Sequence, residues 1–489
     1  MSETDSLLPV KRKTQQVIAA RSSIGDTLVE ETDGPQISKY GHSHASFASS
    51  LGFGGDEEYE EEGVPRHSTW VHTAFLLLGD IVGTGVLSLA AAFAGFGWIF
   101  GIILVVFFAL ANYHTGTMLH RLCLKHPTAH SYGGLITAVF GDSQLTRIVH
   151  KGIYVYLFFF LGDYLMVLAL SVQDIFWGWK LCKPIAAAIA CGGLLITNQL
   201  RTLTHVAIAA VAGFVTIMAT IALTLARAGM GADIKYVDDD ESHPSTQYLV
   251  ATPSFVRFTM AITSIIFAYD GQKIYPEFIS EMAKPEDFRK ALNVAQPFLC
   301  SVYVIVCCVC YAYYGESAPH YLLDVLNYNW TRTFAGCLMF VHMIISYTIT
   351  QQVLTRALHL MIFPETVNAL YPKDEGYVKG CLHWFGISTA LMIGAYVFTG
   401  LIPFFSQMNS LIGALFDPLL CFVLPSIMLY KSGIEMSTLD KLGGLFYVFV
   451  VGVFAWGPGT GVAIYSIAES SDDVGGPFSC QCIAKQCST

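Results

Sequence analysis

Two stretches that interrupt apolar runs decide the fold of this chain: GDIVGTGVL at residues 79–87 and FAYDGQKIYPE at residues 267–277. The first places three glycines and a carboxylate inside an apolar run, and the second places a glycine, a proline and three charged residues inside another. Such residues disfavour a continuous helix. Non-helical backbone at membrane depth is tolerated only where protein or a water-filled cavity surrounds it. We therefore expect two broken helices with a functional site between them.

The composition requires a lipid bilayer as part of the solvent. Of the 489 residues, 54% are hydrophobic and 13% are charged, whereas roughly a quarter of the residues in a soluble domain are charged. The mean hydropathy is +0.52, and a chain this apolar could not hide its side chains in one compact core. The formal net charge of −10 argues against nucleic acid as a partner, because binding to phosphates needs a basic surface.

About twenty apolar residues cross a hydrocarbon core of about 30 Å, and the sequence contains eleven such runs. They lie near residues 69–93, 97–120, 149–178, 182–200, 203–228, 254–276, 291–314, 333–362, 379–400, 402–430 and 441–467. The predicted fold class is therefore all-α and integral to the membrane, with the termini on opposite sides. Between the second and third runs, residues 131–149 mix apolar and polar side chains, which is typical of a short interfacial helix.

The charge distribution predicts which side of the membrane each loop faces. With a cytosolic N-terminus, basic residues such as Arg121, Lys284 and Lys431 fall on the cytosolic side, as the positive-inside rule requires. The acidic loop at 238–241 and the glycosylation acceptor Asn329 then fall on the lumenal or external side.

Three regions follow from this pattern. Residues 1–66 are polar and strongly acidic at 56–62, and we interpret them as a disordered cytosolic tail. Residues 67–468 form the transmembrane domain of eleven helices, and residues 469–489 form a short lumenal or external tail. The stretch ETDSLL at residues 3–8 resembles an acidic dileucine sorting signal. The multi-pass protein is therefore expected either in the plasma membrane or in the vacuolar or endolysosomal membrane.

Most of the thirteen cysteines lie inside apolar runs, where a thiol usually behaves as a small hydrophobic side chain. Cys480, Cys482 and Cys487 crowd the C-terminal tail without the paired spacing of a zinc site. A disulfide, lipidation or no special role are all compatible with this tail. We expect no metal and no cofactor.

The two interruptions suit a small zwitterion. In transporters built from inverted repeats, half-helix N-termini direct partial positive charge at an anionic group, while freed carbonyls hold a cation. An amino acid carries one group of each kind. The alternative is that the glycines only permit close helix packing. Asp80 argues against that alternative, because an ionisable group at this depth costs about 2.5–3.5 kcal/mol on insertion scales.

Three motifs resemble the amino acid/auxin permease family of the APC superfamily, with plant amino acid permeases as the nearest likeness. They are GTGVLSLA at 83–90 closed by GW at 97–98, FAY-x-G at 267–271 with Glu277, and SY at 346–347. The resemblance implies a LeuT-type fold, with two inverted repeats of five helices and an eleventh helix appended. It also implies proton- or sodium-coupled import of amino acids. The chain departs from many relatives at Ala90, where they have proline, and at Gln272, where they have histidine.

The motifs and the resemblance together predict the site residues. The substrate-binding residues are Gly83, Thr84, Gly85, Phe267, Ala268, Tyr269, Asp270, Gly271 and Tyr164. The ion-coupling residues are Asp80, Asp163 and Ser346. The gate residues are Lys273 and Glu277, although their spacing of four also suits an ion pair within one helix.

We expect the other ionisable residues in the apolar runs to have structural roles rather than roles in the site. Asp174 lies near the external end of its run and is expected to be a solvated charge at the rim. Asp417 is expected to pair with a buried donor. Arg356 and His359 lie at the cytosolic end of a long run, where a side chain can extend to the interface.

The predicted function is secondary active transport of a small amino acid, in which one helix bundle rocks against the other. Asp80 or Asp270 would bind the coupling proton or attract the substrate ammonium, and the backbone at 83–85 would hold the carboxylate. The expected partners are the amino acid, H⁺ or Na⁺, and the bilayer. The alternative is an amino acid sensor that signals through its N-terminal tail. An enzyme is not expected, since the sequence contains no HExxH, GxxxxGK[ST] or GxSxG motif.

Overall fold

The computed structural model describes residues 68–201, 206–230, 246–367, 369, 376–402, 404–474 and 478–480, and helices make up nearly all of them. An isolated parallel bridge joins Ser68 to Met282. The expectations for the N-terminal tail, for the acidic loop at 238–241, and for Cys482 and Cys487 lie outside the described residues.

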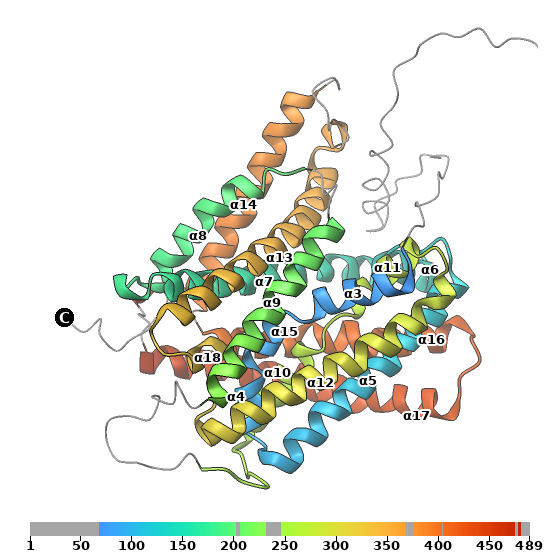
Figure 1. The fold of residues 1–489 in the computed structure, drawn as a ribbon. Helices are drawn as coiled ribbons and strands as arrows, with labels where there is room; N and C mark the ends of the chain where they lie inside the picture. The colour runs from blue at the N-terminus through green and yellow to red at the C-terminus, as the bar shows by residue number, and fades with distance from the viewer. Residues whose placement is uncertain are drawn as a thin grey trace, which may run out of the picture. The chain divides into compact units, whose positions relative to one another are not determined.

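The helices fall into two successive groups and a final span (Figure 1). The first group comprises α3 (Trp70–Ile81), α4 (Thr84–Ala94), α5 (Gly97–Lys125), α6 (Tyr132–Phe140), α7 (Gln144–Ile175), α8 (Lys183–Thr197) and α9 (Val206–Gly229). The second comprises α10 (Phe255–Ala268), α11 (Tyr275–Glu281), α12 (Phe288–Tyr314), α13 (Trp330–Ile362), α14 (Tyr377–Leu401), α15 (Phe405–Leu415) and α16 (Leu424–Ser432). The final span runs from α17 (Thr438–Phe446) through two π-helical segments to α18 (Thr460–Val474).

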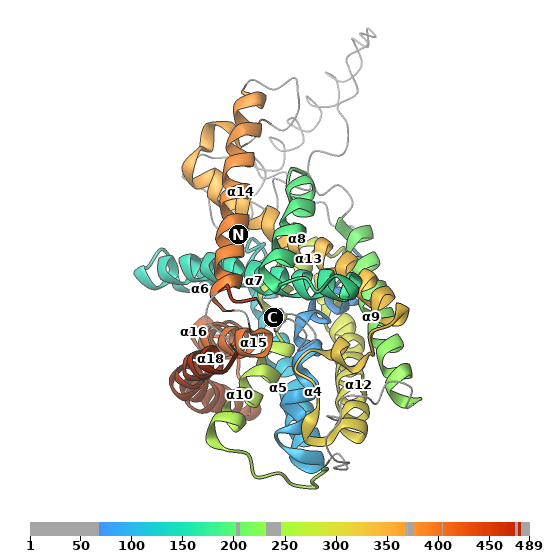
Figure 2. The same cartoon turned by 90° about the vertical axis from the view of Figure 1, so that its left-hand side faces the viewer.

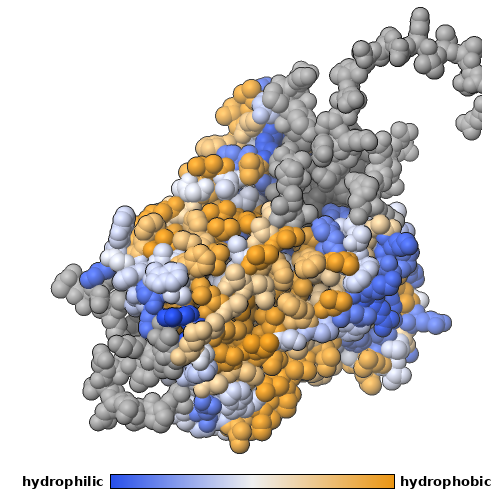
Figure 3. Space-filling view, viewed as in Figure 1, coloured by the Kyte–Doolittle hydropathy of each residue, from blue (hydrophilic) through white to orange (hydrophobic). Residues whose placement is uncertain are grey.

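Within the described part of the chain, eight helices are long and apolar enough to cross a membrane, and α3 with α4 make a ninth span if the bent pair counts as one. The two remaining predicted spans coincide with α8, which has 15 residues, and with the interrupted pair α10 and α11. Large apolar side chains such as Leu110 and Ile305 are exposed on the outer faces of α5 and α12. Figure 3 shows such side chains covering much of one face, as expected of a multi-pass membrane protein.

Both predicted helix breaks are present. Helices α3 and α4 meet at an angle of 60°, with only Val82 and Gly83 between them. Helix α10 ends at Ala268, and α11 begins at Tyr275 after a short 3₁₀ turn. The glycine and proline residues of these stretches therefore interrupt the helices where the sequence indicates.

The two halves pack so that the breaks face each other. Helix α4 packs against α10, and α7 packs along α13 and α8 (Figure 1, Figure 2). Gly85 of α4 lies directly against α10, because a Cβ atom added to it would lie 2.5 Å from the Cα of Ala268. Only glycine allows the two interrupted helices to approach this closely.

The short helix expected after the second run is α6. Its N-cap Ser131 accepts a hydrogen bond from the Gly134 N–H at 2.9 Å, which satisfies one of the free donors of the first turn. It packs against α7, α11 and α16. A helix therefore covers one end of the broken α10–α11 pair.

Asp174 is not the solvated charge that its position in the sequence suggests. Its side chain is fully buried, and its Oδ1 accepts a hydrogen bond from Nε of Arg332 at 2.7 Å. Arg332 also donates to Asp324 at 2.7 Å and to the carbonyl of Leu326 at 2.9 Å. This network joins α7 to α13 at the predicted external end. Removing one partner of such a buried pair typically costs about 3–5 kcal/mol.

Asn329 is the N-cap of α13. Its side-chain oxygen accepts hydrogen bonds from the N–H groups of Thr331 at 2.9 Å and Arg332 at 3.3 Å. The cap explains an asparagine at this position without a glycan, and the glycosylation of Asn329 stays a prediction.

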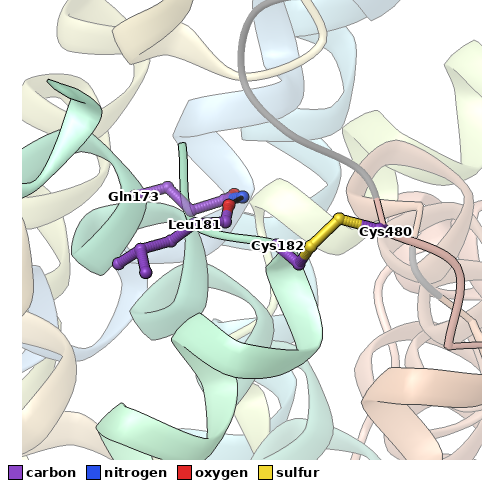
Figure 4. Close-up of a disulfide and its surroundings, with 4 residues drawn as sticks. All are labelled: Gln173, Leu181, Cys182 and Cys480. Carbon is purple, nitrogen blue, oxygen red and sulfur yellow. Dashed lines mark hydrogen bonds between the residues drawn. A yellow bond between two sulfur atoms is a disulfide. The ribbon is translucent and has the colours of Figure 1, made fainter. Parts of the chain in front are cut away.

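A disulfide between Cys182 and Cys480 ties the beginning of α8 to the C-terminal tail (Figure 4). The sequence left a disulfide, lipidation or no role open for Cys480, and the structure has the disulfide. The backbone of Phe478 also donates to the carbonyl of Gly400 at 2.9 Å, at the end of α14. Disulfides persist in oxidising compartments, which agrees with the predicted lumenal or external side for both cysteines.

A third interruption, which we did not predict, lies between α15 and α16. After α15 the chain passes through Phe416 and Asp417 into a π-helical segment, Pro418–Val423. Proline has no N–H to donate to the preceding turn. The helix therefore changes its hydrogen-bonding pattern directly beside a buried carboxylate.

We expect Gly85→Ala to destabilise the fold, because the new methyl group would overlap the backbone of α10. Overpacking of this kind costs about 1–3 kcal/mol, measured as a lower unfolding temperature of the detergent-solubilised protein. The matched control is Gly152→Ala in α7, where nothing lies within 4 Å of an added Cβ. Equal unfolding temperatures for the two variants would show that the close approach of α4 and α10 contributes nothing.

Candidate substrate site

A cavity of about 430 Å³ lies at the two breaks. Its walls come mainly from α3, α7, α9, α11 and α13. Residues near the predicted cytosolic ends of these helices, such as His72, Glu281 and Arg356, belong to its lining. On the other side of the breaks, α4 and α10 are in contact at Gly85. The cavity therefore extends from the breaks toward the predicted cytosolic side.

The hydroxyl group of Tyr303, on α12, joins the two breaks. It donates to the carbonyl of Ala268 at 2.6 Å and lies 3.2 Å from the carbonyl of Ile81. These carbonyls belong to the last residues of α10 and α3, and the carbonyl of Ile81 also accepts a hydrogen bond from the Gly83 N–H at 2.9 Å. One buried side chain thus supplies a partner to the freed backbone of both interrupted helices.

Polar side chains of α5 and α12 support the second break. The amide of Asn112 donates to the carbonyl of Tyr269, and its oxygen accepts a hydrogen bond from Gln296 at 2.5 Å. The amide of Gln272 donates to the hydroxyl of Thr115 at 3.0 Å. The unwound segment is therefore held from behind, on the side away from the cavity.

The N-terminus of α4 provides N–H donors beside the cavity. Its N-cap is Gly83, which lines the cavity and has no side chain to cap the helix. The first N–H groups of a helix have no partner within it, and the helix dipole adds partial positive charge there. This half-helix is therefore suited to an anionic group.

Asp80 is the acidic group that faces the cavity from α3. It is exposed to the cavity although it lies deep in the protein. The carboxylate and the N-terminus of α4 lie within the same break, three residues apart in sequence. The cavity thus presents one negative and one positive element side by side.

Asp270 and Lys273 form an ion pair inside the second break, and the alternative that Lys273 pairs with Glu277 within one helix is wrong. Oδ2 of Asp270 accepts hydrogen bonds from Lys273 and from the hydroxyl of Tyr156. The ammonium of Lys273 also lies 4.3 Å from the ring centroid of Phe160, a cation–π distance. The ammonium group of Lys273 therefore already balances the charge of Asp270.

Glu277 is held by α6 instead. One of its carboxylate oxygens accepts a hydrogen bond from the backbone N–H of Tyr132 at 3.2 Å. Both residues line the cavity. Glu277 therefore connects α11 to the helix that covers it, and its role in a gate stays a prediction.

Asp163 lies behind the cavity with 0% of its surface exposed. When the amide of Asn409 is oriented to satisfy its neighbours, it donates to Oδ1 of Asp163 at 2.8 Å and accepts from Ser88. The hydroxyl of Thr84 is also a hydrogen-bond partner of Asp163. These neutral contacts join α7 to α4 and α15, next to the first break.

The structure separates the predicted site residues into two sets. Those that line the cavity are Asp80, Gly83, Tyr164, Lys273, Glu277 and Ser346. Those that are buried around it are Thr84, Gly85, Asp163, Phe267, Ala268, Tyr269, Asp270 and Gly271. The second set shapes the breaks, whereas the first set is accessible to a ligand in this conformation.

Two arginines of the cavity were missed as site residues. Arg356 lines the cavity together with Arg201, whose guanidinium lies 5.8 Å from the ring centroid of Trp384. The spacing of His342, Ser346 and Arg356 on α13 follows one helical face, and this periodicity was the signal that could have identified Arg356.

The described residues contain no group of three or more His, Cys, Asp or Glu side chains that could hold a metal ion. The cavity is instead lined by aromatic rings, a few charged side chains and free backbone groups. Such a mixture suits a small polar molecule with an apolar part.

The fold is of the LeuT type. The crystal structure of MhsT in complex with L-phenylalanine matches with a TM-score of 0.53 and 12% sequence identity, over 83% of this chain and 100% of that chain. The identity is too low to indicate more than the fold. Two interrupted helices at corresponding positions of the two halves belong to this class of transporter fold.

The chain belongs to the family of transmembrane amino acid transporter proteins, whose model matches residues 66–465. It is 25% identical to the N amino acid transport system protein of Neurospora crassa, over 90% of this chain and 95% of that protein. It is 24% identical to amino acid permease 1 of Arabidopsis thaliana, over 73% of this chain and 80% of that protein. The predicted resemblance to the family is confirmed.

We expect Tyr303→Phe to lower the stability of the protein, because the buried carbonyl of Ala268 would lose its side-chain donor, whereas the carbonyl of Ile81 keeps the N–H of Gly83. An unsatisfied buried polar group costs about 1–3 kcal/mol, and the unfolding temperature in detergent measures this loss. The control is Tyr313→Phe on the same helix, where the hydroxyl bonds the carbonyl of Gly229 at an exposed site. A Tyr303→Phe variant as stable as the control would contradict the role given to Tyr303.

Proposed function

We propose that this protein is a secondary active transporter of a small amino acid, coupled to a proton or sodium gradient and working by alternating access. The observation that carries the proposal is the cavity at the two breaks, which is lined both by Asp80 and by Gly83, the N-cap of α4. The family and the fold support transport of amino acids as the general activity. The membrane that contains the protein is either the plasma membrane or the vacuolar or endolysosomal membrane.

The two charged groups of an amino acid match the two polar elements of the cavity. The substrate carboxylate binds at the N–H groups around Gly83 and Gly85, where the dipole of α4 favours negative charge. The substrate ammonium binds Asp80. Asp270 does not take this role in the present conformation, because Lys273 already neutralises it.

Lys273 and Glu277 serve as the inner gate in this proposal. Lys273 connects the two ends of the break at α10 and α11 through Asp270, and Glu277 connects α11 to α6. Movement of α11 requires both contacts to change. Because the cavity extends to the predicted cytosolic side, we interpret this conformation as inward-facing.

The coupling ion acts at the buried polar groups next to the first break. Asp163 is fully buried with hydrogen-bond partners that are neutral. A carboxylate in such surroundings is either protonated or balanced by a bound cation. Asp163 and Ser346 therefore remain our candidates for the coupling site, together with Asp80.

We expect Asp80→Asn to reduce uptake by about 30-fold or more, since losing one partner of a desolvated charge pair costs about 2–5 kcal/mol. Uptake is measured in cells that express the full chain, with each of the twenty amino acids supplied in radiolabelled form. The screen also identifies the transported amino acid. The control is Asp142→Asn, which removes an exposed carboxylate that lies 3.4 Å from Arg147.

Equal amounts of both variants in the membrane make the comparison valid. Wild-type uptake by Asp80→Asn would remove Asp80 from the substrate site. Failure of the wild-type protein to move any of the twenty amino acids would overturn the proposed function itself.

A further inference from the structure

Asp417 is a buried acid next to the substrate site for which the proposed function so far has no role. It lies where α15 gives way to a π-helical segment at Pro418. Its side chain is 0% exposed, and neither of its carboxylate oxygens has a hydrogen-bond partner in the described chain. The expectation that Asp417 pairs with a buried donor is therefore wrong.

The other buried acids near the breaks and at the external end each have at least one partner. Asp163 is bonded by an asparagine amide, Asp174 by an arginine, Asp270 by a lysine and a tyrosine, and Glu277 by a backbone N–H. Asp417 differs from all four. An ionised carboxylate without partners is strongly disfavoured in a dry interior, so Asp417 carries its proton in this conformation.

The charged and titratable groups that act on Asp417 come from three directions. Tyr156 and Asp163 reach it from α7, Asp270 and Lys273 from the break after α10, and Cys421 from its own helix. The thiol of Cys421 lies 3.2 Å from Oδ1 of Asp270. Asp270 and Asp417 therefore both depend on the ammonium group of Lys273, and the two carboxyl groups cannot be ionised together at low cost.

Tyr156 connects Asp417 to the cavity. Its ring packs against Phe416, the residue before Asp417, with 5.3 Å between the ring centroids. Its hydroxyl donates to Asp270 at 2.5 Å and accepts a hydrogen bond from the ammonium of Lys273 at 3.2 Å. Tyr156 itself lines the cavity. Tyr156 therefore contacts both the cavity and the residue that precedes Asp417, and its hydroxyl lies at the Asp270–Lys273 pair.

We propose that Asp417 is the residue that carries the coupling proton, and that the proton reaches it from the cavity through the hydroxyl of Tyr156. This inference rests on the proposed function, makes the coupling ion a proton, and gives the coupling role to Asp417 in place of Asp163, Ser346 and Asp80. On release, the hydroxyl of Tyr156 turns from Asp270 toward Asp417, its oxygen takes the proton of Asp417, and its phenolic proton passes to water that enters from the cavity. One carboxylate and one hydronium ion result.

Release of this proton changes the inner gate. While Asp417 is neutral, Lys273 interacts with Asp270 alone. Once Asp417 is ionised, it competes with Asp270 for the ammonium group and for the hydroxyl of Tyr156. The ion pair inside the second break then weakens, and α11 becomes free to move in the empty transporter. The transporter that carries both the amino acid and the proton moves with Asp417 neutral, so exchange does not require proton release. Proton release on one side of the membrane is thereby linked to the conformational change.

The test separates exchange from accumulation. The full-length protein is reconstituted into liposomes and supplied with an equimolar mixture of the twenty radiolabelled amino acids. In the exchange assay, labelled amino acids outside the liposomes replace unlabelled ones inside, and no net movement of protons is required. In the accumulation assay, the amino acids move against their concentration gradient, which requires coupling to the movement of protons. With one proton per amino acid, the wild-type protein should accumulate label by about tenfold for each pH unit of an imposed gradient.

Asp417→Asn keeps the shape of the neutral acid but cannot release a proton. We expect it to exchange amino acids at the wild-type rate and to lose accumulation driven by the pH gradient. Asp417→Glu should retain accumulation with an altered pH profile. Asp142→Asn, at the exposed ion pair, should behave as the wild-type protein in both assays.

The opposing outcomes are distinct. Wild-type accumulation by Asp417→Asn, or accumulation that follows a sodium gradient instead of a pH gradient, would overturn this inference and leave the proposed function intact. Loss of exchange in folded Asp417→Asn and Asp417→Glu would show a requirement for transport itself and would also overturn it. No exchange by the wild-type protein would refute the proposed function.

A chemical labelling experiment on the wild-type protein tests the same proposal if the variants do not fold. A hydrophobic carbodiimide reacts with protonated carboxyl groups in apolar surroundings, and mass spectrometry locates the modified residue. We expect modification at Asp417 that increases as the pH falls, together with loss of accumulation. An unmodified Asp417 in a protein that is inactivated by the reagent would contradict the proposal.

Discussion

The structure depends on one constraint, which is that backbone groups released by a broken helix inside a membrane must find partners within the protein. Here the hydroxyl of Tyr303 serves the last carbonyls of both α3 and α10. The amide of Asn112 serves the next carbonyl of the second break. Because these partners lie on α12 and α5, behind the breaks, the opposite side of each break remains available to a ligand.

The same arrangement explains why the site is asymmetric along the membrane normal. On the predicted external side, Gly85 brings α4 into direct contact with α10, and the Arg332 network ties α7 to α13. On the predicted cytosolic side, the cavity separates α3 and α11 from α7 and α13. The contacts that would have to change are few and polar, notably those of Lys273 and Glu277.

The sequence predicts features that depend on local chemistry, and it fails where partners come from distant helices. Glycine and proline in apolar runs located both main breaks. By contrast, Lys273 pairs with Asp270 rather than Glu277 because an unwound backbone brings i and i+3 together. Asp174 is buried in a pair with Arg332, which lies 158 residues further along the chain. Arg356 was missed because its place at the cytosolic end of a long apolar run is also explained by a side chain that extends to the interface.

The most direct test of this account is an experimental structure of the protein with its transported amino acid bound. The account predicts that α3–α4 and α10–α11 remain interrupted, with the ligand carboxylate at the N-terminus of α4 and its ammonium group beside Asp80. A ligand bound away from both breaks, or continuous helices through residues 79–87 and 267–277, would contradict it.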